Sequence, residues 1–202
     1  ANAACMKASL KAGKVVSLPS AVTIADGTAV KTPGDIVFPY IQKNLDDIIT
    51  VEDEELIVNF LDVVENHKMV VENSGLLTVA ALKHLNCKDK RVVSILSGGN
   101  MDIITMSSVV QHGLIERGRV FTVSVQLPDR PGELVNVANV IAQLKGNVIR
   151  LEHNQFVSIN RNAAVELKIT LEAFGHEHKQ QIVDALKEKG YDPKLENPTS
   201  LY

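Results

Sequence analysis

The amino-acid sequence predicts an α/β protein of two parts. In residues 14–117, short apolar segments alternate with amphipathic helical segments, a pattern typical of crossover units and at least part of a parallel sheet. Residues 119–202 follow the order strand, helix, two strands, helix and strand, which is the split-βαβ, ferredoxin-like order. The sequence Arg117-Gly118-Arg119 separates the two patterns, so we expect domains at residues 1–117 and 118–202.

The first part is predicted to begin with a strand and to continue with alternating helices and strands. Short apolar runs predict strands at Val15–Leu18, Asp47–Val51 and Arg91–Leu96. Helices are expected over residues 34–44, 53–64, 75–85 and 101–116, the last closed by Gly118. Thr50 and Asp53 have the spacing of a capping box before the second helix. One face of that helix carries apolar residues at helical spacing, namely Leu56, Ile57, Phe60, Leu61 and Val64.

The second part begins with a predicted strand over residues 120–127. Pro131 suits the first position of the helix that follows, whose expected core face is Leu134, Val137, Ala138 and Ile141. Two paired strands are expected over residues 148–159 and 163–171, around the turn Asn160-Arg161-Asn162. A helix over residues 177–189 and a short strand over 191–195 complete the pattern.

Composition excludes several classes of protein. The chain has 21 Lys+Arg against 24 Asp+Glu and a net charge of -3, so it lacks the basic excess of a nucleic-acid-binding protein. No apolar run approaches the ~20 residues of a membrane-spanning helix, so no membrane contact is expected. The two cysteines, Cys5 and Cys87, cannot form a disulfide framework, which favours a cytoplasmic location.

The second part resembles an ACT domain, a small amino-acid-sensing regulatory module. The resemblance rests on Val123–Leu134, which includes the sequence D-R-P-G-E-L, and on Gly146-Asn147-Val148. Free backbone N–H groups at a helix start suit a small carboxylate, so we expect an amino-acid effector at Asp129, Arg130, Pro131, Gly132 and Asn147. In the family, ligands lie between this turn and the second strand, often across a pair of domains. The simpler interpretation is a plain turn in a domain that serves only assembly.

The first part is similar to the C-terminal part of the catalytic domain of threonine ammonia-lyases (threonine dehydratases). These enzymes use pyridoxal 5'-phosphate and share the tryptophan synthase β-like fold. The matching stretches occur in the family's order: Thr23–Gly27, Asp46–Ile48, Val51–Leu56, Val71–Gly75 and Ser94–Asp102.

The resemblance implies cofactor-binding roles for Ser97, Gly98 and Gly27. The family serine at the position of Ser97 hydrogen-bonds the pyridine nitrogen of the cofactor, and the counterpart of Glu72 lies near the cofactor as a possible catalytic acid. Without the resemblance, Ser97-Gly98-Gly99-Asn100 is a generic turn into a helix with Asn100 as N-cap, and Glu72 is an acid favoured at a helix start. No metal site is expected, because Cys5 replaces the carboxylate that some relatives use.

The family's lysine motif and its glycine-rich phosphate loop do not occur in these 202 residues. We therefore expect part of a threonine (or serine) dehydratase that is inactive alone and belongs to a homodimer or homotetramer. Two alternatives stay open: a non-enzymatic amino-acid sensor whose first part is a scaffold, and a nucleotide-binding module that uses the S-G-G-N turn.

Overall fold

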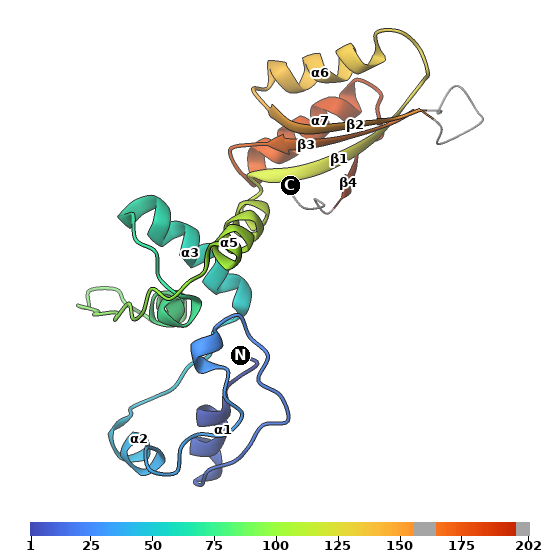
Figure 1. The fold of residues 1–202 in the computed structure, drawn as a ribbon. Coiled ribbons are helices and arrows are strands. Elements are labelled where there is room, and N and C mark those ends of the chain that lie inside the picture. Colours follow the sequence, from blue (N-terminus) through green and yellow to red (C-terminus); the bar gives the residue numbers. More distant parts are fainter. Residues whose placement is uncertain (156–164, 197–202) are drawn as a thin grey trace. The chain divides into compact units, whose positions relative to one another are not determined.

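The computed structural model describes residues 1–155 and 165–196. Figure 1 shows the ribbon of these residues. The chain divides into two compact units, residues 1–113 and residues 114–202, and each has its own hydrophobic core. The division falls inside a helix, a few residues before the boundary expected at Arg117–Arg119. Each unit is therefore described by itself.

Unit 1 consists of helices and long connecting segments. Its elements are α1 (Cys5–Ala12), η1 (Asp26–Thr28), α2 (Phe38–Asn44), α3 (Asp53–His67), η2 (Asn73–Leu76), α4 (Leu77–Ala80), η3 (Ala81–His84) and α5 (Ile103–Glu116), which continues into unit 2. The core lies between α3, η2, α4 and α5 and contains Leu56, Phe60, Val63, Leu76, Ala80 and Val109. Helix α5 approaches α3 closely at Gly113, where a Cβ atom would lie 2.7 Å from Leu61 Cδ1.

Helix α3 begins at Asp53 as predicted, but its capping box lies two residues later than expected. The capping box uses Glu52 and Glu55, not Thr50 and Asp53: the Glu52 N–H donates to the Glu55 carboxylate over 2.9 Å. This hydrogen bond lowers the pKa of Glu55, and His84, whose Nε2 lies 2.9 Å from Glu55 Oε1, lowers it further. The apolar face of α3 was predicted correctly for Leu56, Phe60 and Leu61, which are buried.

Three predicted strands and one predicted helix of unit 1 differ from the structure. The segments Val15–Leu18, Asp47–Val51 and Arg91–Leu96 are not strands in the described residues. A strand needs a neighbouring strand for its N–H and C=O groups, and these segments have only isolated bonds, such as Leu18 N–H to Lys31 O at 2.8 Å. The single helix expected over residues 75–85 is instead the succession η2, α4 and η3.

Unit 2 has the element order expected from the sequence. Its elements are β1 (Val120–Leu127), α6 (Glu133–Gln143), β2 (Asn147–Asn154), β3 (Val165–Glu172), α7 (His176–Glu188) and β4 (Lys194–Glu196). The strands form an antiparallel sheet in the order β2-β3-β1-β4, which makes β2 an edge strand. The turn expected at Asn160–Asn162 lies outside the described residues.

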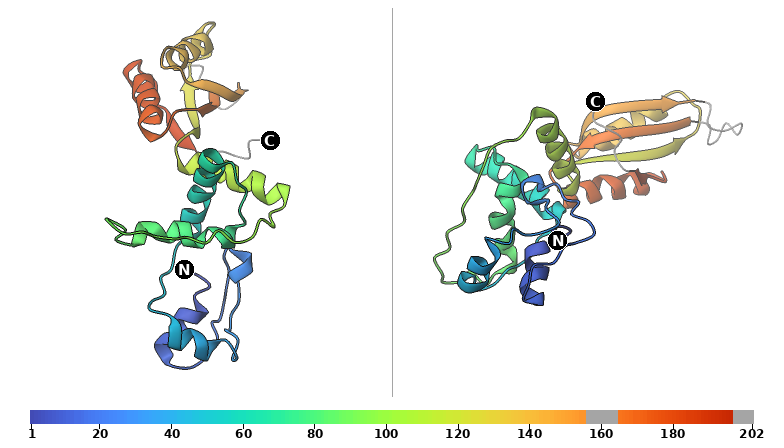
Figure 2. Two further views of the ribbon diagram at one scale, coloured as in Figure 1. Left: turned by 90° about the vertical axis from the view of Figure 1, so that its left-hand side faces the viewer. Right: turned by 60° about the horizontal axis from the view of Figure 1, so that its bottom comes forward.

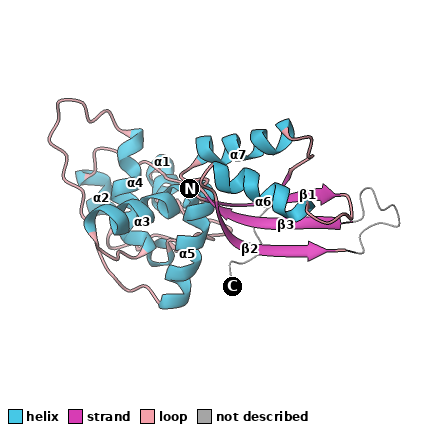
Figure 3. Cartoon of the chain, turned by 90° about the horizontal axis from the view of Figure 1, so that it is seen from above, coloured by secondary structure: helices cyan, strands magenta, loops and turns pink. Residues whose placement is uncertain are grey.

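Helices α6 and α7 cover one face of this sheet (Figures 2 and 3). Alternate residues of β1, such as Val123 and Val125, point into the core that they share with the two helices. The buried stripe of α6 is Val137, Val140 and Ile141, at spacings of three and four residues. The prediction that Leu134 and Ala138 belong to this face is wrong: both are exposed, and Leu134 lies in the first turn of a helix that begins at Glu133, not at Pro131.

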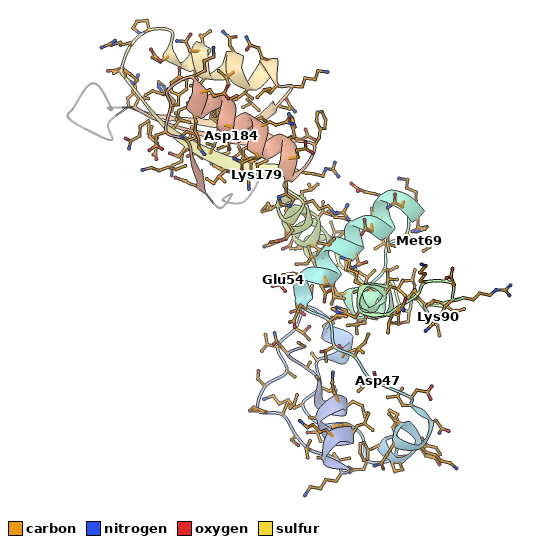
Figure 4. The ribbon with its side chains drawn as sticks, turned by 180° about the vertical axis from the view of Figure 1, so that it is seen from behind. Asp47, Glu54, Met69, Lys90, Lys179 and Asp184 are labelled. Carbon is orange, nitrogen blue, oxygen red and sulfur yellow. The ribbon has the colours of Figure 1, made fainter. Side chains whose placement is uncertain are left out.

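The polar side chains of α7 include one that is buried. Asp184 lies on the exposed side of the helix (Figure 4), where it accepts a hydrogen bond from Gln180 over 2.8 Å. Lys179 is half-buried, and its Nζ lies 5.7 Å from the centroid of the Phe121 ring. His178 is buried and stacks on Phe174 with ring centroids 4.8 Å apart. Its Nδ1 accepts the Phe174 N–H over 3.0 Å, and its Nε2 lies 2.7 Å from the Leu144 carbonyl oxygen. His178 therefore ties α7 to the end of α6.

Candidate functional site

Three segments of unit 1 that are far apart in the sequence meet around the carboxylate of Glu72. They are the loop Thr23–Thr28, the start of η2 at Glu72–Gly75, and the turn Ser97–Gly99. The first is fixed by Asp53 at the start of α3, which accepts hydrogen bonds from Thr23 Oγ1 and from the Ile24 N–H, the latter over 3.1 Å. The second is tied to the first by Asn73, whose Nδ2 donates to Ile24 O over 3.0 Å.

Glu72 joins the second and third segments. Its backbone N–H donates to Gly98 O over 3.3 Å. Its side chain is half-buried, and Oε1 accepts a hydrogen bond from Ser74 Oγ over 2.7 Å. The two side chains are therefore held together between the other two segments.

Glycines make this approach possible. Gly98 has φ +78°, and a Cβ atom there would lie 2.4 Å from Glu72 Cδ. At Gly27 a Cβ atom would lie 2.7 Å from Ser74 Oγ, and at Gly75 it would lie 1.9 Å from Ser97 O. Any side chain at these positions would displace Glu72, Ser74 or the turn, because real Cβ atoms do not approach so closely.

An open cavity of about 460 Å³ adjoins this cluster, with Glu72, Asn73, Asn100 and Asp26 among its lining residues. Asn73 is 5% exposed, and its Oδ1 has no hydrogen-bond partner among the residues that the structure describes. A buried acceptor without a donor is costly in a folded protein. It is therefore a candidate contact for a bound group or water.

The structure brings together most of the site residues expected in unit 1. Gly27, Glu72 and Gly98 lie in one cluster, and Ser97 lies beside it with an exposed side chain. Ser74 was not expected among the site residues, because nothing in its sequence neighbourhood indicates that its hydroxyl reaches Glu72.

Neither the residues at the start of α5 nor the side chains of metal-binding type form a second site within the residues that the structure describes. Asp102, not Asn100, caps α5: it accepts the Thr105 N–H over 2.9 Å, and its hydrogen bonds to Thr105 lower its pKa. Cys5 is buried in α1. Within the residues that the structure describes, no three His, Cys, Asp or Glu side chains are arranged to hold a metal.

In unit 2 the expected effector turn is exposed. Asp129, Arg130 and Pro131 face solvent, and the Arg130 N–H bonds to Pro128 O over 2.9 Å. Gly132 precedes α6 with φ +96° and open space where a Cβ atom would lie. The left-handed backbone therefore explains the glycine, since no atom of the described residues would meet a Cβ atom there.

The structure does not bring Asn147 and this turn together within one chain. Asn147 pairs with Glu172, which also pairs with Val120 at the start of β1, and its Nδ2 donates to the Glu172 carboxylate over 3.2 Å. The turn follows the other end of β1, at Leu127. The seven steps of ~3.3 Å from Val120 to Leu127 separate the two positions by roughly 23 Å.

Comparison with known proteins finds a family match for most of the first unit. Residues 1–98 match the model of the family described as pyridoxal-phosphate dependent enzyme. The chain is also similar to L-threonine ammonia-lyases. It is 38% identical to the one from Geobacter sulfurreducens over 185 residues, which are 91% of this chain and 46% of the relative. It is 33% identical to the one from Thermotoga maritima over 195 residues, 96% of this chain and 49% of the relative.

A solved structure agrees with this assignment. The processed form of threonine deaminase isoform 2 from Solanum lycopersicum is 30% identical, with a TM-score of 0.51 over 55% of this chain and 34% of that one. The chain spans about half the length of the curated relatives described above. Among the helices that the structure describes, none is long and apolar enough to cross a membrane.

Proposed function

We propose that this chain forms part of a pyridoxal-phosphate dependent threonine (or serine) ammonia-lyase, which converts L-threonine to 2-oxobutanoate and ammonia. The observation that carries the proposal is the convergence of Gly27, Glu72 and Gly98 in the part of the chain that matches the family. The similarity to two L-threonine ammonia-lyases over 91% and 96% of the chain supports it.

The residues of this site fit the ring edge of pyridoxal phosphate. The exposed Ser97 can hydrogen-bond a ring nitrogen, and Gly27 and Gly98 make room for Ser74 and Glu72 beside it. The family's lysine motif and glycine-rich phosphate loop do not occur in the 202 residues. We therefore propose that another part of a longer enzyme holds the aldehyde and phosphate groups, and that residues 1–202 alone are inactive.

The cofactor, when bound, supplies an electron sink that makes the α-proton of an amino acid removable. The Ser97 hydroxyl would bind the ring nitrogen of the cofactor without holding a proton on it, which would suit loss of the β-hydroxyl as water. Glu72 keeps a carboxylate between the two glycine turns, where Oε2 can accept or return a proton. L-threonine loses one water molecule from its β-carbon, and a second water molecule is consumed when ammonia is released. The products are 2-oxobutanoate and ammonia.

The test uses an assembled enzyme, in which residues 1–202 replace the matching segment of the Geobacter sulfurreducens relative. Ser97→Ala is expected to lower kcat about 5- to 150-fold, because one lost hydrogen bond is worth ~1–3 kcal/mol. The cofactor, followed by its absorbance, stays bound. Unchanged kcat and KM in Ser97→Ala would show that Ser97 does not contact the cofactor.

For unit 2 we propose an amino-acid-sensing ACT module that works as a pair of copies. The βαββαβ order and the exposed turn Asp129–Gly132 support this. The edge strand β2 exposes Val148, Ile149 and Leu151, and such an edge can pair with a second chain. Antiparallel pairing of two β2 strands would bring Asn147 of each copy toward the end of the sheet where the partner's turn lies. A homodimer or homotetramer would thus complete a site that one chain leaves divided.

Calorimetry on residues 1–202 with threonine, serine and branched-chain amino acids tests this module. We expect one of them to bind below millimolar concentration, and Leu151→Lys to abolish both dimer formation and binding. If no amino acid binds to a dimer at that level, the module serves only assembly. We also propose a cytoplasmic location, supported by the free thiols of Cys5 and Cys87.

A further inference from the structure

Ser74 makes a contact that the turn containing it does not require. The turn at the start of η2 is closed by its backbone, through the Gly75 N–H to Glu72 O at 2.9 Å. Asn73 fastens the same segment to Ile24. The Ser74 hydroxyl does not cap the helix; it donates to Glu72 Oε1 over 2.7 Å.

The pair of side chains is enclosed by glycines from two other segments. The Glu72 carboxylate lies against the backbone of Gly98, and Ser74 Oγ lies against Gly27. Rotation of the carboxylate toward either turn is therefore restricted by backbone, while Ser74 holds one of its two oxygens. Within residues 1–155 and 165–196 the structure gives Oε1 this donor and gives none to Oε2.

We propose that Ser74 is a positioning residue for Glu72. By binding Oε1, the hydroxyl fixes the plane of the carboxylate and leaves Oε2 to act on the ligand. A hydrogen bond to an ionised group is shorter and stronger than one between neutral groups, so it can hold a side chain in one orientation. The role rests on the function proposed above, whereas the hydrogen-bonded pair is a property of this chain alone.

Two arms test the proposal. In the first, NMR spectra of residues 1–202 are compared for wild type, Ser74→Ala and Ser94→Ala. Ser94 is the matched control, because its hydroxyl makes only a 3.5 Å contact with Thr78 O. We expect Ser74→Ala to shift the NMR resonances of the Glu72 side-chain carboxyl carbon and of the Gly98 amide. Ser94→Ala should leave both resonances unchanged. Unmoved resonances in Ser74→Ala would overturn the pair itself.

In the second arm, kcat and KM are measured in the assembled enzyme. Ser74→Ala is expected to lower kcat about 10-fold with KM within twofold, because the hydroxyl orients a reacting group and does not bind substrate. Ser74→Thr, which keeps the hydroxyl, should recover most of kcat. An unchanged kcat in Ser74→Ala, or equal losses in the Ala and Thr variants, would overturn the positioning role. An inactive wild-type assembled enzyme that retains the cofactor would instead contradict the proposed function, and the positioning role with it.

Discussion

Gly98→Ala separates two physical effects at the centre of the candidate site. The residue has φ +78°, so any Cβ atom strains the backbone by ~1–2 kcal/mol. The same Cβ atom would lie 2.4 Å from Glu72 Cδ and 2.5 Å from Oε1, so the carboxylate must leave its place beside the turn. We expect Gly98→Ala to lower the free energy of unfolding by about 2.5–5 kcal/mol, the sum of the strain and of one lost charge-assisted hydrogen bond worth ~1.5–3 kcal/mol.

Gly13→Ala is the matched control. Gly13 has φ +68° in the same unit, but nothing lies within 4 Å of the position of its Cβ atom, so only the strain of ~1–2 kcal/mol applies. Urea unfolding of residues 1–202 measures both variants, and Glu72→Ala completes a double-mutant cycle with Gly98→Ala. Equal losses at positions 13 and 98, together with no coupling between 98 and 72, would refute the packing of Glu72 against the turn.

Two further predictions concern stability, one for each unit. Glu55→Ala removes the capping box of α3 and should destabilise unit 1 by about 1 kcal/mol at neutral pH. Folding lowers the pKa of Glu55, so the stabilisation that the Glu55 carboxylate provides is complete above its ordinary pKa of 4.5. That stabilisation fades as the pH falls through the lower pKa of the folded state. Unfolding curves of both proteins at several pH values check it, and a difference that grows toward acid would be contrary to the assignment. His178→Phe leaves the Phe174 N–H and the Leu144 carbonyl without partners and should cost unit 2 about 2–4 kcal/mol in urea, whereas a loss below 0.5 kcal/mol would mean that water replaces the ring.

The sequence was most informative where structure is determined locally. The bounds of β1 were predicted correctly, because alternation through Val123 and Val125 is followed at once by the break Asp129–Gly132. The strands expected in unit 1 depend on partners outside the segment itself. Within the described residues, Val93 and Ile95 are exposed and their segment has no neighbouring strand, which no propensity can reveal.

The candidate site was predictable only in part. Gly27, Glu72 and Gly98 were named from the family resemblance, and the structure groups them around one carboxylate. The role of Ser74 depends on contact between side chains across a turn, which spacing alone does not indicate. The separation of Asn147 from the effector turn follows from strand register, which sets which ends of two strands meet.

Turnover of L-threonine by the assembled enzyme tests the central claim most directly. We predict that residues 1–202, joined to the remainder of the Geobacter sulfurreducens relative, form 2-oxobutanoate from L-threonine in a reaction that requires added pyridoxal phosphate. Residues 1–202 alone, given the same cofactor, should form none. An assembled enzyme that folds and retains the cofactor but produces no 2-oxobutanoate would contradict the claim.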